Sequence, residues 1–189
     1  MTTSIDVANR AIGLLGGRPI TSFTEESNEA RIAKAMYLST RDTVLRAYPW
    51  ASLKRRAALA KLAENPISGF AHQFQLPSDC LRVLEVHNVE RLSDQFWEVN
   101  GDLILTDEAK ISIVYLSSKV PEDKMSSHLV QALAYHLASE MAYAMTGSNQ
   151  AQVNFNNLYQ QILMEARTTD SLEQSYKRIG PRNFERVRL

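Results

Sequence analysis

Cys80 is the only cysteine of the chain, and it follows Ser78 and Asp79. Two histidines, His72 and His87, lie on either side of it. A nucleophilic cysteine needs a partner that lowers its pKa, whereas a neighbouring carboxylate disfavours the thiolate. A lone cysteine in an apolar strand is usually a small buried side chain. We therefore expect Cys80 to fill space in a strand and not to act as a nucleophile.

His136 and Glu140 are the second candidate pair, because residues four apart share one face of a helix. The zinc helix of metalloproteases needs a second histidine four residues after the first, with a glutamate beside it, and the sequence lacks this pattern. We expect a hydrogen-bonded pair in the core or between subunits. Phosphate loops, dinucleotide-binding glycines and paired carboxylates are also absent from the sequence. The sequence therefore predicts no enzyme, no metal and no cofactor.

Lys54, Arg55 and Arg56 form a consecutive basic triplet that could contact DNA. Three charges do not hold a duplex alone, so a solvated turn or rim explains them equally well. A ring of identical subunits would repeat the triplet around a channel. The triplet therefore predicts a DNA channel only within such a ring.

The last helical segment, residues 149–175, carries amides where a solvated helix usually carries lysine and glutamate. A neighbouring subunit can cover amides without burying charge, which favours a subunit interface over an ordinary polar surface. Lipid would leave these amides unpaired, so the charge-free stretch 141–164 is not a membrane span. The residues that we expect at the interface are Asn154, Asn157, Gln160 and Gln161.

The C-terminal tail, residues 177–189, interleaves basic and apolar side chains. Its five basic residues and one glutamate give a side-chain charge of +4, so the rest of this neutral chain carries −4. Such a segment is typical of one that orders on a partner, and a frayed terminus is the alternative. The residues expected to contact the partner are Lys177, Arg178, Ile179, Arg182, Phe184, Arg186, Arg188 and Leu189.

Four helices are predicted to position these residues. The first starts at Ser4 as N-cap and stops at Gly16, and the second starts among glutamates and ends before Pro49. The third follows Pro121 and has an i,i+4 apolar row of Leu129, Leu133, Leu137 and Met141. The fourth has an apolar stripe of Ala151, Phe155, Leu158, Ile162 and Ala166.

The middle of the chain alternates apolar and polar residues as in strands, with a break at Pro77 and a hairpin at Asn100–Gly101. Residues 70–117 therefore predict one small antiparallel sheet, while residues 50–62 are compatible with helix or strand. The predicted fold is α+β and mainly α. Residues 1–49 and 118–176 form a helical bundle, residues 50–117 form an inserted β lobe, and residues 177–189 form an extended tail.

The composition suits a single domain with an inserted lobe. Hydrophobic residues make up 44% of the 189 residues and charged residues 22%, as in ordinary soluble proteins. A single cysteine fits a reducing compartment, and the N-terminal residues lack a signal-peptide pattern. We expect a soluble protein made in a cytoplasm.

The order and spacing of five segments resemble the tail tubular protein A family, the head-to-tail adaptors or gatekeepers of short-tailed phages. The segments are ANRAIGLLGGRPITSF, EESNEARIAKAMYLSTRDTVLRAYPW, FQLPSDCLRVLEV, FWEVNGDLILTDEAKISIVYLSS and HLVQALAYHLASEMAYAMTGS. The resemblance covers nearly the whole chain. Each motif is degenerate, so the order, spacing and total length carry the resemblance.

The resemblance implies a structural virion protein with no catalytic residues. Its subunits would form a dodecameric ring between the portal protein and the tail nozzle protein, often with tail fibres attached, and double-stranded DNA would pass through the lumen. The tail, residues 177–189, would reach the portal, although some members have an acidic C-terminus. Assembly would occur in the host cytoplasm. Two alternatives differ in class: a small intracellular metal- or ligand-binding enzyme domain that uses His136 and Glu140, and a monomeric DNA-binding adaptor.

Overall fold

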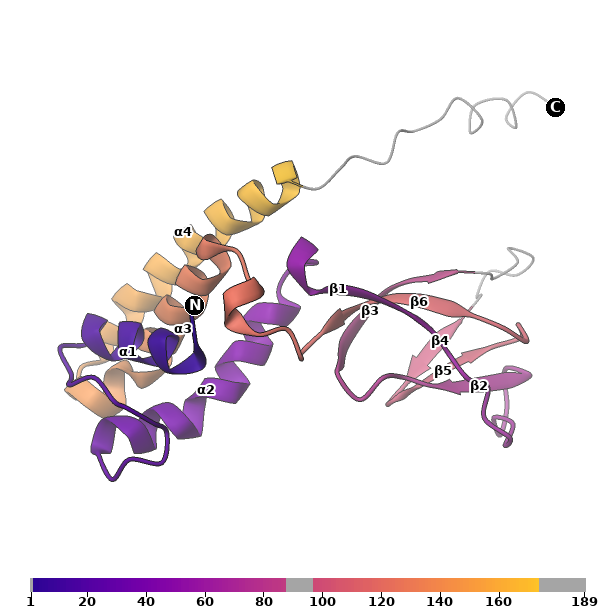
Figure 1. Ribbon diagram of the computed structural model, residues 1–189, viewed down its shortest axis with the longest axis horizontal. Coiled ribbons are helices and arrows are strands. Elements are labelled where there is room, and N and C mark those ends of the chain that lie inside the picture. The colour runs from indigo at the N-terminus through magenta and orange to yellow at the C-terminus, as the bar shows by residue number, and fades with distance from the viewer. Residues whose placement is uncertain (1, 88–96, 174–189) are drawn as a thin grey trace.

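The chain forms a bundle of helices with a β lobe inserted between the second and third helix (Figure 1). The computed structural model describes residues 2–87 and 97–173. It confirms the predicted class, mainly α with a small β lobe. The helices are α1 (Ser4–Leu14), α2 (Asn28–Arg46), α3 (Ser127–Thr146) and α4 (Asn149–Glu173), with short 3-10 turns η1 (Ala51–Leu53) and η2 (Glu122–Lys124).

Side-chain caps set where the first two helices begin. The hydroxyl of Thr3 accepts a hydrogen bond from the backbone N–H of Asp6, and the Asp6 carboxylate accepts one from the N–H of Thr3. The N-cap of α1 is therefore Thr3, one residue before the predicted Ser4, because only Thr3 completes this reciprocal box. Ser27 caps α2, and Glu29 is the acidic residue in its first turn.

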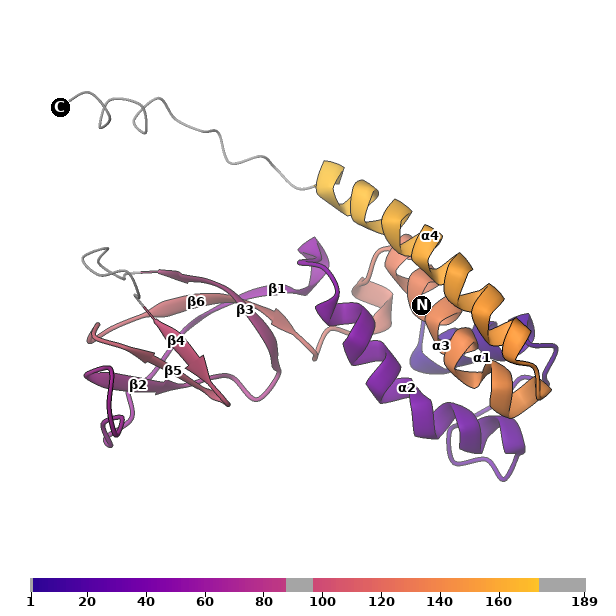
Figure 2. The ribbon, with the colours of Figure 1, turned by 180° about the vertical axis from the view of Figure 1, so that it is seen from behind.

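Helix α3 is the centre of the bundle and packs against α1, α2 and α4. Figure 2 shows α4 lying along it. The predicted row is fully buried: Leu129, Leu133, Leu137 and Met141 have no exposed surface. Alanines on the other faces of α3 are also buried, so three helices approach it closely. Gly147 ends α3 in the left-handed conformation, with φ +69°.

The β lobe contains two three-stranded antiparallel sheets, not the single predicted sheet. One sheet has the order β1-β6-β3 and the other β2-β5-β4, so most neighbours are distant in sequence and only β4 and β5 are consecutive strands of the chain. A small core lies between them, around Phe74, Ile104 and Ile113. The strands are β1 (Lys54–Ala58), β2 (His72–Gln75), β3 (Cys80–His87), β4 (Glu98–Asn100), β5 (Leu103–Thr106) and β6 (Ser112–Ser117).

Two local features of the lobe differ from simple alternation. The turn of the β4–β5 hairpin contains Gly101 and Asp102, because Asn100 still pairs with Leu103. Gly101 has φ +62°, a conformation that glycine adopts without strain. Strand β3 has register shifts near residues 81 and 84, so it turns apolar side chains toward the helical core as well as the lobe core.

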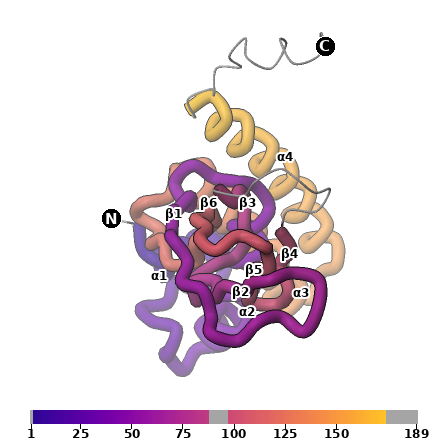
Figure 3. Tube along the Cα trace, turned by 90° about the vertical axis from the view of Figure 1, so that its right-hand side faces the viewer, coloured from indigo at the N-terminus to yellow at the C-terminus, as the bar shows by residue number. Residues whose placement is uncertain are grey.

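The boundary between bundle and lobe lies slightly inside the predicted range 50–117. Trp50, Leu53 and Leu116 are fully buried in the helical core, so β1 enters the lobe at Lys54. The bundle and the lobe lie at opposite ends of an elongated molecule (Figure 1), and Figure 3 shows the lobe in front of the helices. The chain crosses between them twice, at η1 and after β6.

Candidate functional site

Among the described residues, the surroundings of Cys80 lack the arrangement of a nucleophile. Cys80 starts β3 and packs half-buried against the lobe core. Burial, followed by the charge of Asp79, raises the pKa of its thiol. His72 lies on β2 in the other sheet, and the Nε2 atom of His87 lies 3.3 Å from a carboxylate oxygen of Glu85. The residues considered as a candidate nucleophile and its helpers are therefore divided between the two sheets, as different structural contacts.

Asp79 ties the start of β3 to the end of β6. Its carboxylate accepts a hydrogen bond from the hydroxyl of Ser117 and, at 3.4 Å, one from Tyr115. Its carbonyl accepts the backbone N–H of Ser118 at 2.8 Å. These bonds explain a carboxylate at this position without any catalytic role.

His136 and Glu140 do not form a metal site among the described residues. His136 lies half-buried between α3 and α4, and its ring stacks on Tyr159 with centroids 4.3 Å apart and planes 10° apart. Its Nδ1 atom has no hydrogen-bond partner in the described structure, so the expected contact is a ring stack instead. Burial lowers the pKa of His136, and Glu140 opposes that shift. Across the described ranges, no three metal-binding side chains gather in one place.

The basic triplet is split by the strand that carries it. Lys54 lies opposite Leu116 on β6 and Arg56 opposite Val114, so these two basic residues share one face of the sheet. Arg55 points to the other face, and its Nη1 atom donates to the carbonyl of Ser52 at 3.1 Å. Strand β1 is also an edge strand, where basic residues commonly discourage pairing with another chain. The structure therefore brings together two of the three predicted residues.

The exposed face of α4 is almost free of charge. Asn154, Asn157, Gln160 and Gln161, the residues predicted for a subunit interface, are all exposed. Val153 (52%) and Met164 (68%) are exposed apolar side chains on either side of these amides, and Leu172 (70%) is exposed near the end of the helix. The charged residues that α4 exposes are Glu165 and Glu173, both in its second half. The face is continuous along a helix of 25 residues.

The predicted apolar stripe of α4 is partly wrong. Phe155, Ile162 and Ala166 face α3, but Leu158 is 41% exposed. Tyr159 and Leu163 are buried in its place. The inward face of α4 is thus rotated by about one residue relative to the prediction. The ring of Tyr159, which stacks on His136 of α3, takes the place expected for Leu158.

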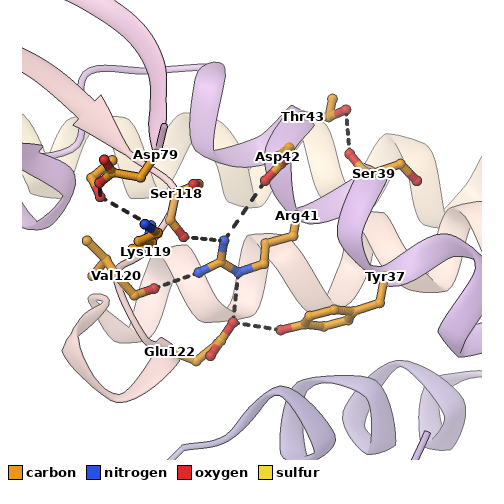
Figure 4. A network of polar contacts seen from close by, with 11 residues as sticks. Tyr37, Ser39, Arg41, Asp42, Thr43, Asp79, Ser118, Lys119, Val120 and Glu122 are labelled. Atoms are coloured by element: carbon orange, nitrogen blue, oxygen red, sulfur yellow. Dashed lines mark hydrogen bonds and ion pairs between the residues drawn. The ribbon is translucent and has the colours of Figure 1, made fainter. Parts of the chain in front are cut away.

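Arg41 clamps the second crossing to α2 (Figure 4). Its guanidinium donates to the carbonyl oxygens of Ser118 at 2.8 Å and Val120 at 2.6 Å, and to Oε1 of Glu122 at 2.8 Å. The hydroxyl of Tyr37 donates to the same glutamate oxygen at 2.9 Å. Burial and the glutamate charge raise the pKa of Tyr37, which keeps this hydroxyl protonated. Arg41 is only 7% exposed, so water screens these contacts little.

Asp170 on α4 holds the first crossing in a similar way. Its buried carboxylate accepts the backbone N–H of Ala51 at 3.1 Å and so satisfies the first backbone donor of η1. One turn earlier, Arg167 donates from Nη2 to the carbonyl of Ala47 at 3.2 Å. Both crossings into the lobe are therefore fixed by charged side chains from the bundle.

Neither of these two joints was predicted, although the spacing of Arg41 and Asp170 along their helices indicates inward positions. Arg41 falls four residues after Tyr37 and three before Val44, so it occupies the buried stripe of α2. Asp170 likewise falls four residues after Ala166. A charged residue at an inward position is a sign of a buried polar contact.

The residues predicted to bind the portal, Lys177 to Leu189, lie outside the described residues. Within the described ranges, no helix combines the length and apolar character needed to cross a membrane. Comparison with protein-family models and with curated proteins finds no match to this chain.

Proposed function

We propose that the protein is a structural component of a phage virion, a head-to-tail adaptor whose subunits form a ring. The ring joins the portal protein to the tail nozzle, retains packaged DNA and lets it pass on ejection. The resemblance of the sequence to the tail tubular protein A family motivates this proposal. The face of α4 carries it, because this face suits burial against another subunit.

The character of the α4 face supports an interface between copies of the chain. Burying a lone charge costs several kcal/mol, whereas amides exchange their water for hydrogen bonds across an interface. Val153 and Met164 add apolar surface beside Asn157 and Gln161. A heterologous contact, in which this face meets a different surface of the next subunit, gives a ring when the rotation between subunits closes.

Replacing a central amide by a carboxylate tests this interface. Asn157→Glu keeps the helix but places an unpaired charge in the contact, and ring symmetry repeats the change in each subunit. We expect the wild-type protein to form a large cyclic assembly with the portal, seen by light scattering and electron microscopy, and Asn157→Glu to stay small. Ala35→Glu, an exposed helix position on α2, is the charge-matched control. A wild-type protein that stays monomeric with the portal present contradicts the proposal.

The tail and the basic strand have separate roles in this proposal. Residues 177–189 bind the portal, so a chain that ends before Lys177 keeps its fold and loses portal binding. Normal docking of this shortened chain would overturn that assignment. Lys54 and Arg56 face the channel, and changing both to Glu alters DNA retention or ejection in assembled virions. Unchanged ejection would place this face of β1 outside the lumen.

A further inference from the structure

A pocket of about 330 Å³ opens where the end of α2 meets the β lobe. Its walls come from the β3 edge of one sheet and from the β4 hairpin of the other, so the lobe and the bundle both contribute. The residues that give it chemical character are Arg46, Cys80, Arg82, Trp97 and Val99. A volume of this size fits one ring or one branched side chain.

The pocket combines positive charge with apolar surface. Arg46 and Arg82 are the charged residues among its described lining residues, and neither has an ion pair within the described ranges. Arg46 lies in the last turn of α2 and lines the pocket together with Cys80. The half-buried indole of Trp97 provides an aromatic wall. Two guanidinium groups beside an aromatic wall are suited to an oxyanion on an apolar body.

We propose that this pocket binds a small organic anion, in which a carboxylate or phosphate ester pairs with Arg46 and Arg82 and a single apolar ring packs against Trp97. The basic tail of the chain is a poor occupant, because its charge of +4 is repelled by both arginines. The pocket is also too small for duplex DNA. The proposal does not depend on the adaptor function, since it concerns a different surface.

The two tryptophans make the binding measurable. Trp50 is fully buried in the helical core, whereas Trp97 lines the pocket, so a ligand should alter the fluorescence of Trp97 alone. The probes are benzoate and phenyl phosphate as anions, benzyl alcohol as the neutral analogue and benzylamine as the cation. We expect saturable binding of one or both anions, at least about tenfold weaker binding of the alcohol, and no binding of the amine. The stronger of the two anions identifies the preferred oxyanion.

Protection of Cys80 gives a second measurement that does not use fluorescence. Cys80 is the only cysteine and lines the pocket, so a bound anion should slow its reaction with the neutral reagent 4,4′-dithiodipyridine. Trp97→Phe should remove the fluorescence change and keep the protection.

Charge-matched variants separate a specific site from a general attraction. Arg46→Gln and Arg82→Gln should each weaken benzoate or phenyl phosphate binding about tenfold, because each removes one charged hydrogen-bond donor. Arg56→Gln loses the same charge on the same lobe but outside the pocket, and should leave binding unchanged. All three positions are exposed, so circular dichroism should show the wild-type fold. Equal binding of benzyl alcohol, equal loss in Arg56→Gln or no saturable binding would overturn the proposal.

Discussion

Removing Arg41 should loosen the joint between the bundle and the lobe more than any surface change. In Arg41→Met the apolar stem remains, but the ion pair to Glu122 and the bonds to the carbonyls of Ser118 and Val120 are lost. The two ionic side chains are only 9% and 13% exposed, so solvent replaces these contacts poorly. Breaking a buried pair on one side costs about 3–5 kcal/mol. That is a large part of the total stability of about 5–15 kcal/mol of an ordinary domain.

Chemical denaturation followed by circular dichroism measures this loss, and a double-mutant cycle assigns it to the pair. Glu122→Gln removes the close anionic partner of the buried Arg41 and leaves only the longer ion pair, 3.9 Å, to the half-exposed Asp42, so it should also destabilise the protein. Because both single changes break the same contact, the double variant should lose at least about 1 kcal/mol less than the sum of the two. Hydrogen exchange should become faster in residues 118–125.

Arg31→Met is the matched control on the same helix. Arg31 is exposed and donates one hydrogen bond to Asn28, so its loss should stay within about 0.5 kcal/mol. A loss below about 1 kcal/mol for Arg41→Met would refute the reasoning, because the ion pair would then only offset its own desolvation.

Three further changes probe other contacts. Burial lowers the pKa of His136 below its unfolded value of about 6.5, so the unfolded chain takes up the proton first and stability falls as pH drops below about 6.5. His136→Phe should flatten this decline in denaturation midpoints between pH 7 and 5, and an unchanged slope would contradict the assignment. Asp170→Ala should cost about 1–3 kcal/mol in chemical denaturation, because the N–H of Ala51 loses its acceptor. Cys80→Ala should cost about 1 kcal/mol and leave the assembled size unchanged by light scattering; a failure to assemble would restore a special role for the thiol.

The bundle could be predicted where each inward position is apolar. In α3 the row from Leu129 to Met141 has leucine or methionine at every fourth residue, and the observed burial follows it. In α4 the pattern is weaker, so Leu158 was placed inside although Tyr159 takes that position through its stack on His136. The spacing of Arg41 in α2 indicates an inward position, but its partners could not be predicted, since they are carbonyl groups about 80 residues away.

The lobe could be predicted as strands but not as sheets. Alternation identifies a strand, yet it does not identify its neighbour. Strand β6 pairs with both β1 and β3, and the first of these pairings joins Lys54 to Leu116. The same limit applies to the pocket between Arg46 and Trp97, because its walls come from elements that only the folded chain brings together.

The Asp170 contact also defines a path for mechanical load. Asp170 lies three residues before the end of α4, and its carboxylate bonds directly to the backbone of Ala51, where the chain enters β1. A force applied to the chain beyond Glu173 would thus act on Ala51, just before β1, through the side chain of Asp170. This contact does not involve the interior of the bundle. Tension at the C-terminal end of α4 would therefore act directly on the first crossing, at Ala51.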